Sequence, residues 1–303
     1  MQLDTCHIEQ LNEDGWVLIE GVLSPKELEA ARPGLEHYYP TVEAYYADPS
    51  QHTWLQDDMF AGVIWFPFTD AYLTALPFHP EIVAFVEAAL GHQDIRFLRG
   101  DLQAKYAGAA DYDQMLHFDY PNHNLVVPGQ RPEDRQLGFF MYFSDVTEAH
   151  GPTHLVSKKH TRDLPVGFTH FFRDEASAQG PHFFKAAPEL YEVEEPAVGP
   201  AGSLLVYDLA ALHRSSRITA VEGTRLTLAF SYGGSDAWQG YQCWPRLGED
   251  ESLRKFLIQA TPRQRSLLGF PPIEDPYWTE DTLIRVGARY PGMDMRPYRD
   301  AMA

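Results

Sequence analysis

The chain has 303 residues, of which 44% are hydrophobic and 22% charged, and its formal net charge at pH 7 is −19. A chain of this length buries a large apolar core without help from disulfides or a structural metal. Because its acidic excess repels polyanions, nucleic acids and anionic membrane surfaces are excluded as expected partners.

The ends and the cysteines carry little targeting information. Cys6 and Cys243 lie far apart and outside any Cys-x-x-Cys spacing, which is typical of free thiols in a reducing compartment. The first residues show no basic region followed by an apolar run, and no stretch approaches the roughly 20 apolar residues of a membrane span. We therefore expect a cytoplasmic protein whose partner is a small-molecule substrate, and the sequence leaves its oligomeric state open.

The first third of the chain predicts one strand and two helices. The apolar run 16–19 lies between two glycines and predicts a strand. Ser24 with Glu27 forms a capping box, so we expect a helix from there to about Tyr39. A second helix is expected over 79–90, ended by a left-handed Gly91.

From residue 94 to 232 the apolar runs are short and separated by turn residues. Six of them predict strands, at 95–98, 102–106, 115–120, 137–143, 204–207 and 225–232. Many short strands without intervening helices favour a sandwich or barrel over a parallel α/β sheet. The tail is helical again, at 250–260 and after a capping box at Thr261.

One short motif in the β region suggests a metal site. His117-Phe118-Asp119 lies in a predicted strand, where residues i and i+2 point to the same face. Two histidines and one carboxylate leave open positions on Fe(II), as oxygenases require. A third ligand would have to come from another strand across the barrel. The same spacing occurs where no core strand is predicted, at His7-x-Glu9, His79-x-Glu81 and His92-x-Asp94.

The predicted strand 225–232 alternates between two kinds of side chain. Arg225, Thr227 and Ser231 share one face, and the other face is fully apolar. A buried arginine is costly unless an anion accompanies it. Two explanations stay open, a structural ion pair with an Asp or Glu and a bound carboxylate ligand gripped by the guanidinium.

Together, His117-x-Asp119, His213 and Arg225 resemble the pattern of the phytanoyl-CoA dioxygenase-like family of Fe(II)/2-oxoglutarate-dependent oxygenases. The segments 14–24 and 144–160 resemble the same family, so the likeness covers most of the chain. Two features depart from it. Ser157-Lys158-Lys159-His160 stands where the family commonly has Pro-Gly-Ser-His, and the tail 261–298, a lid or substrate wall in our expectation, is outside the general pattern.

The resemblance implies a mainly β fold with flanking helices, a double-stranded β-helix (jelly roll, cupin-like). We expect one domain over 1–303, with an N-terminal helical and strand part at 1–93, a jelly-roll core at 94–233 and a C-terminal helical extension at 234–303. The implied cofactors are Fe(II), 2-oxoglutarate as co-substrate and O2.

The resemblance also implies roles for single residues. His117, Asp119 and His213 would hold the metal, and Arg225, helped by Thr227, the 5-carboxylate of 2-oxoglutarate. Further contacts to the co-substrate are expected from Gln103 and Lys105, on the strand before the motif, and from Ser215, although exposed strand positions and a turn serine explain them equally well.

The implied reaction oxidises a substrate C–H bond, with release of succinate and CO2. The Asp119 carboxylate favours hydroxylation, desaturation or ring formation over halogenation, for which the family has a small residue there. Other functions stay open, namely a non-catalytic jelly-roll binding or sensor protein, an acyl-CoA hydroxylase of the same family, and a cupin-like metal isomerase or hydrolase. The sequence does not identify the substrate.

Overall fold

The computed structural model describes residues 3–56, 60–109, 112–119, 134–161, 176–177, 180–184, 188–234 and 250–302. Its helices and 3-10 turns are α1 (Thr5–Asp14), α2 (Pro25–Tyr38), α3 (Val42–Ala47), η1 (Pro49–Leu55), α4 (Ala71–Ala75), η2 (Leu76–Phe78), α5 (Pro80–Leu90), η4 (Glu148–His150), α7 (Lys158–Thr161), α9 (Pro188–Glu192), α10 (Glu251–Gln259), α11 (Pro262–Leu267), α12 (Glu280–Arg289) and α13 (Arg296–Asp300). Its strands are β1 (Trp16–Ile19), β2 (Ile64–Trp65), β3 (Ile95–Tyr106), β4 (Gln136–Tyr142), β5 (Thr153–Val156), β6 (Ala176–Ser177), β7 (Gly180–Phe184), β8 (Glu194–Pro196), β9 (Leu204–Asp208), β10 (His213–Ser215) and β11 (Thr224–Gly234).

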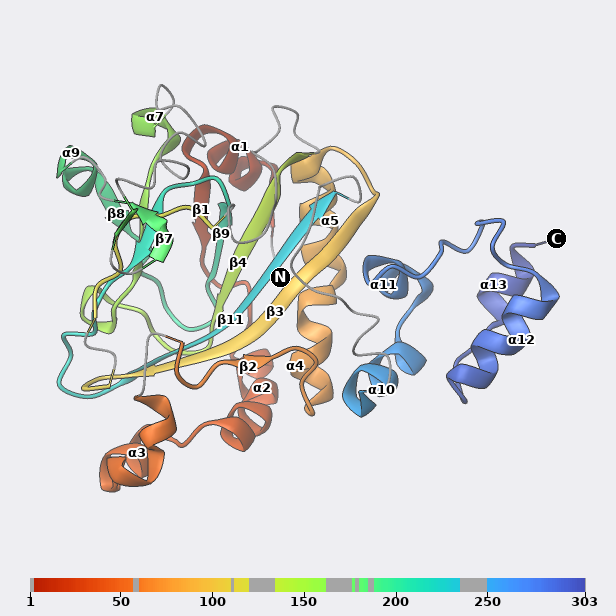
Figure 1. Cartoon of the computed structure of the whole chain (residues 1–303), viewed down its shortest axis with the longest axis horizontal. Helices are drawn as coiled ribbons and strands as arrows, with labels where there is room; N and C mark the ends of the chain where they lie inside the picture. The colour runs from red at the N-terminus through yellow and green to blue at the C-terminus, as the bar shows by residue number, and fades with distance from the viewer. Residues whose placement is uncertain are drawn as a thin grey trace.

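Two antiparallel sheets carry the fold (Figure 1). The larger has six strands in the order β1-β9-β4-β11-β3-β2, and the smaller has three in the order β10-β5-β8. The described strands form no closed barrel, but the mainly antiparallel architecture with flanking helices is the jelly-roll class that the sequence predicted. Strands β1 and β2 come from the predicted N-terminal part, so that part completes the large sheet.

The helix boundaries follow the local chemistry that predicted them. Ser24 caps α2 by accepting a hydrogen bond from the Glu27 amide, and the Glu27 carboxylate accepts one from the Ser24 amide. Gly91 ends α5 in a left-handed conformation with φ 76°, which an L side chain adopts only at a cost. The capping box at Thr261 begins α11.

The predicted strands are confirmed, with one exception. The runs 95–98 and 102–106 form one continuous strand, β3, because Arg99, Gly100 and Asp101 stay extended. The predicted strand 115–120 is wrong over its described residues 115–119. These residues pair with the sheet only through an isolated bridge between His117 and His213. Two hydrogen bonds of that bridge, His117 N to His213 O (2.8 Å) and His213 N to His117 O (2.9 Å), are enough to fix the segment locally.

The main core lies between the large sheet and α5. Leu228, Phe230 and Tyr232 on β11 join the buried side chains of α5 in one cluster, and Phe139 stacks on Phe230 with ring centroids 4.7 Å apart. The predicted apolar face of this strand therefore packs against helices, as expected. Arg225, Ala229 and Ser231, on the alternate positions, border the space between the sheets.

The run Ala71–Leu90 is long and apolar enough for a membrane span, which the sequence analysis did not anticipate. In the structure it is α4, η2 and α5 in succession, and 61% of the apolar window is buried. Its apolar side chains pack in the main core, so burial inside the fold accounts for its composition.

Candidate metal centre

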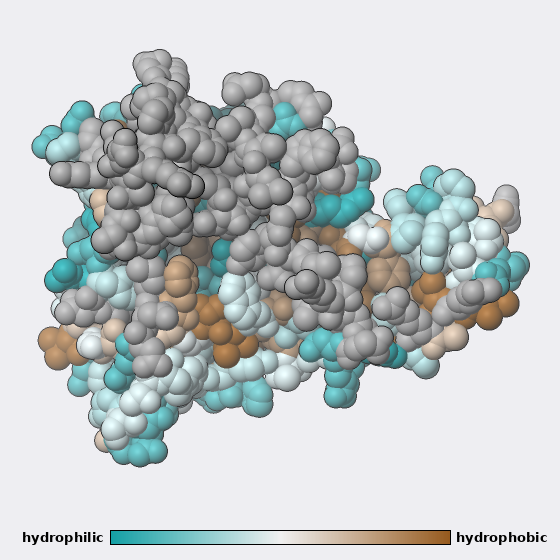
Figure 2. Space-filling model, in the orientation of Figure 1, coloured by the Kyte–Doolittle hydropathy of each residue, from teal (hydrophilic) through white to brown (hydrophobic). Residues whose placement is uncertain are grey.

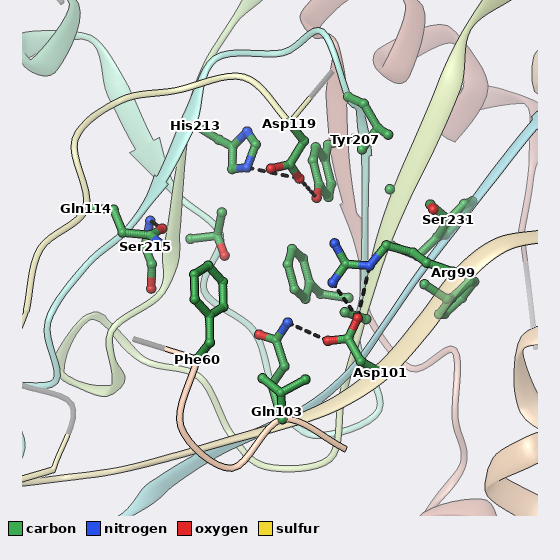
Figure 3. Close-up of a pocket in the computed structure, with 18 of the residues that line it drawn as sticks. Phe60, Arg99, Asp101, Gln103, Gln114, Asp119, Tyr207, His213, Ser215 and Ser231 are labelled. Carbon is green, nitrogen blue, oxygen red and sulfur yellow. Dashed lines mark hydrogen bonds and ion pairs between the residues drawn. The ribbon is translucent and has the colours of Figure 1, made fainter. Parts of the chain in front are cut away.

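A cavity of about 460 Å³ lies between the two sheets. The large sheet contributes residues of β3, β4, β9 and β11 to its wall, and the small sheet contributes Thr153, His213 and Ser215. Loop residues 114–119 and the segment at β2 complete the lining. Figure 3 shows the side chains that converge on it. No described residue of the tail beyond Ser231 lines the cavity, so the described part of 261–298 supplies no substrate wall here.

His117, Asp119 and His213 meet at one part of this cavity. One ligand atom from each lies within 4.8 Å of the other two. Asp119 Oδ1 is 3.7 Å from His117 Nε2, and Asp119 Oδ2 is 3.5 Å from His213 Nε2 (Figure 3). Two imidazole nitrogens and one carboxylate at these separations fit a divalent metal and leave the cavity side open. His213 is bridged directly to His117 rather than reaching from across a barrel, which corrects our expectation.

The protein fixes the histidine tautomers through the backbone. His117 Nδ1 lies 2.9 Å from the Met115 carbonyl oxygen, and His213 Nδ1 lies 3.0 Å from that of Ala211. Because a carbonyl only accepts, each Nδ1 carries the proton and each Nε2 presents its lone pair to the metal position. Both rings are buried, with 5% of each residue exposed.

Tyr207 orients the carboxylate. Its hydroxyl donates to Asp119 Oδ2 at 2.7 Å, and burial together with the Asp119 charge raises the pKa of Tyr207 well above its usual value, so it stays a donor. The ring fits because its partner on β4 is a glycine. A Cβ at Gly138 would lie 2.5 Å from the Tyr207 ring. The sequence analysis missed Tyr207, since its apolar run 204–207 predicts only core.

Two cationic side chains, the buried Arg225 and the partly buried Lys105, lie at another part of the cavity. Arg225 pairs with Lys105 across β11 and β3, and Ser215 Oγ accepts from Lys105 Nζ at 3.2 Å and from Arg225 Nη2 at 3.1 Å. Arg225 also donates to the Gly151 carbonyl, and Lys105 Nζ lies 4.4 Å from the centroid of the Tyr112 ring. Burial, and next the charge of Arg225, lower the pKa of Lys105 well below its usual value.

Among the described residues no carboxylate pairs with either cation, so the structural ion pair considered from sequence is not formed. The other nearby arginines are already paired, Arg214 with Glu194 and Asp113, and Arg217 with Asp113. Two cations without a carboxylate partner in the described part of the chain are a site for an anion. Lys105, expected from sequence as a further contact to the co-substrate, lies beside Arg225.

The other residues proposed from sequence as co-substrate contacts do not all line the cavity. Gln103 lines the cavity and donates from Nε2 to Asp101 Oδ1 at 2.7 Å. Thr227 is buried on the same face of β11 but does not line the cavity. The histidines of the three other motifs with the same spacing do not line the cavity. His7 caps α1, His79 caps α5, and His92 follows the end of α5.

Sequence reasoning also missed Arg99 and Asp101. They lie in the gap between two predicted strands, so they were assigned to a turn. A signal was present, because Arg99, Asp101, Gln103 and Lys105 alternate along one strand face.

Comparison with known families settles the class of this protein. A family model described as phytanoyl-CoA dioxygenase matches residues 11–222. The chain belongs to the phytanoyl-CoA dioxygenase family. The match includes His117, Asp119 and His213 and ends just before Arg225. Membership confirms the resemblance found from sequence, and it makes this chain a member of the non-haem iron oxygenases that use 2-oxoglutarate.

Solved structures with the same fold include enzymes of this kind. The 2-oxoglutarate-dependent carbocyclase SnoK from nogalamycin biosynthesis is 17% identical with a TM-score of 0.53, over 80% of this chain and 87% of its own. HygX from Streptomyces hygroscopicus, solved with nickel, 2-oxoglutarate and hygromycin B bound, is 20% identical with a TM-score of 0.52, over 77% and 88%. AviO1 from Streptomyces viridochromogenes is 16% identical with a TM-score of 0.50, over 78% and 98%. A search of curated proteins found no match.

Proposed function

We propose that this protein is an Fe(II)- and 2-oxoglutarate-dependent dioxygenase that oxidises, in the first place by hydroxylation, a C–H bond of a small organic metabolite with release of succinate and CO2. His117, Asp119 and His213 would hold the iron. The observation that carries the proposal is that these three ligands border one cavity together with two cations, Arg225 and Lys105, which have no carboxylate partner among the described residues. We also propose that residues 1–303 act as one domain and that the protein works in the cytoplasm.

The proposed role of each residue follows from its charge and hydrogen-bonding groups. When bound, the iron supplies the redox chemistry of O2 activation, driven by decarboxylation of the co-substrate. Arg225 and Lys105 would hold the distal carboxylate of 2-oxoglutarate, with Ser215 Oγ placed between them. The Gln103 amide is the proposed polar contact to the co-substrate nearer the metal. Thr227, which is buried on the same face of β11 as Arg225 but does not line the cavity, would support the cavity wall at Arg225. The buried, narrow site keeps water from the oxidant.

Succinate release measures turnover even before the substrate is known. The protein with Fe(II), ascorbate, O2 and 2-oxoglutarate is expected to form succinate, and a metabolite library should contain compounds that accelerate it. The reaction should stop without O2 or Fe(II). A sensor protein would bind iron and 2-oxoglutarate but release no succinate with any compound, and a metal isomerase or hydrolase would turn over under nitrogen. Either result would contradict the proposal.

Tyr207→Phe is expected to weaken metal binding about 10- to 100-fold, the usual cost of losing a partner that orients a metal ligand. The physical reason is that Asp119 Oδ2 loses the hydrogen bond from the Tyr207 hydroxyl while the ring packing stays. Co(II) titration followed by visible absorption measures the affinity without turnover. Tyr232→Phe is the matched control, because that buried hydroxyl donates to the Pro77 carbonyl, away from the metal position. Equal Co(II) affinity in the wild type and Tyr207→Phe would remove Tyr207 from the site.

A further inference from the structure

The cavity has a second polar end that the metal and the two cations do not use. Arg99, Asp101, Gln103 and Lys105 follow one another along the cavity face of β3, and Arg99 is paired with Ser231 on β11. Six residues of strand separate Arg99 from Lys105, a distance of about 20 Å at 3.3 Å per residue. A five-carbon diacid has four carbon–carbon bonds of about 1.5 Å each, so it covers only part of this length. The Arg99 end therefore remains for the substrate.

The Arg99 end is polar but charge-compensated. Asp101 is completely buried, and its Oδ2 accepts from Arg99 Nε at 3.0 Å and from Arg99 Nη2. Its Oδ1 accepts from Gln103 Nε2 at 2.7 Å (Figure 3). One carboxylate thus fixes a guanidinium and an amide side by side on the wall. An anionic group would have to compete with Asp101, and a cationic group with Arg99, so a neutral group with both donors and acceptors fits best.

A buried hydroxyl adds to this polar wall. Ser231 is 1% exposed, and its Oγ borders the cavity but has no hydrogen-bond partner in the described part of the chain. A buried polar atom without a partner is uncommon and costs stability unless a ligand or water satisfies it. Tyr207, which donates to Asp119, lines the same cavity as Arg99 and Asp101, so this polar end shares the cavity with the metal position.

Aromatic side chains lie at the mouth above this wall. Phe60 is 62% exposed and Trp65 is 49% exposed, and both line the cavity. Figure 2 shows apolar residues on the surface over the β2 region. The Arg99 guanidinium carbon is 5.8 Å from the centroid of the Trp65 ring. Large exposed aromatics at a cavity rim mark a binding surface, and they pack well against the C–H face of a ring.

We propose that this end of the cavity binds a neutral, hydroxylated ring of the substrate, a sugar or cyclitol unit, with its hydroxyls on Arg99, Asp101 and Ser231 and its C–H face against Trp65 and Phe60. The proposal rests on the proposed oxygenase function and names its substrate class. A wholly apolar substrate would leave the Ser231 hydroxyl without a partner among the described residues. A CoA thioester would bring several phosphate charges to a chain of net charge −19, which argues against the acyl-CoA alternative.

The test uses Ni(II)-loaded protein with 2-oxoglutarate, in which binding is measured without turnover. Isothermal titration would compare methyl glycosides and disaccharides of common hexoses and myo-inositol with cyclohexanol, octanoate and coenzyme A. At least one polyhydroxylated ring is expected to bind about tenfold or more tightly than cyclohexanol, because a site built to donate to hydroxyls rejects analogues that lack them. Preference for octanoate, cyclohexanol or coenzyme A, or no binding of any polyhydroxylated ring, would overturn the substrate class.

Two tryptophan variants test whether the ring ligand binds at this end of the cavity. Trp65→Ala is expected to weaken the best ring ligand about tenfold through loss of the stacked face. Trp54→Ala is the matched control, because Trp54 is also surface-exposed, at 39%, but does not line the cavity. Equal weakening in both variants, or in neither, would contradict the assignment. The rise in melting temperature on adding Ni(II) and 2-oxoglutarate is measured alongside. If the wild type lacks that rise, the oxygenase proposal itself fails, whereas a normal rise without ring binding sinks only the substrate class.

Discussion

Asp119→Ala is expected to abolish 2-oxoglutarate turnover and to weaken Co(II) or Fe(II) binding by more than about 100-fold. The loss should exceed the about 10- to 100-fold that removing an orienting partner costs, because a metal ligand and its negative charge disappear together. His117→Ala and His213→Ala should lose turnover as well. Succinate formation measures the first effect, and metal titration of the apoprotein measures the second.

His92→Ala is the control for these substitutions. His92 belongs to a second His-x-Asp in this chain, but it follows the end of α5 and does not line the cavity. Its removal should leave both metal affinity and succinate release unchanged. Full activity of Asp119→Ala would contradict the ligand assignment, and lost metal binding in His92→Ala would show that the spacing had been assigned to the wrong pair.

Arg225→Ala is expected to raise the Michaelis constant for 2-oxoglutarate about 10- to 100-fold, with a smaller change in kcat. A hydrogen bond to a charged group contributes about 1.5–3 kcal/mol, which corresponds to that range of affinity. Lys105→Met should have a smaller effect in the same direction, since the guanidinium remains. The two effects should not add, because both cations approach Ser215 Oγ and would share one carboxylate.

Arg96→Ala provides the comparison for the arginine. Arg96 lies on β3 as well, but it pairs with Asp94 at 2.6 Å and does not line the cavity. The Michaelis constant of the Arg96→Ala variant for 2-oxoglutarate should equal that of the wild type. The rise in melting temperature that 2-oxoglutarate gives the metal-loaded wild type should be small in Arg225→Ala. An unchanged Michaelis constant in Arg225→Ala would mean that the co-substrate carboxylate is held elsewhere, with Arg214 and Arg217 as the next candidates.

Local sequence signals predicted the helices well because each depends on a few neighbouring residues. The Ser24–Glu27 capping box and the left-handed Gly91 set their helix ends without help from the rest of the chain. The strict alternation of 225–232 likewise predicted one buried apolar face. The segment 115–119 misled the same reasoning, since its apolar residues pack around the metal position and only His117 pairs with a strand.

By itself, the sequence predicted the metal-ligating residue types from the spacing of one motif and the many short strands from local periodicity, and its resemblance to a known family predicted the jelly-roll class and the family. Only the tertiary structure decided which side chains meet. It brought Lys105 to Arg225, Tyr207 to Asp119, and Arg99 with Asp101 to the far end of the cavity. The physical reason is that strand register and the approach of two sheets bring together residues that are far apart in the chain, such as Lys105 and Arg225, which are 120 positions apart. No local pattern encodes that register, because it is fixed only when the whole sheet packs.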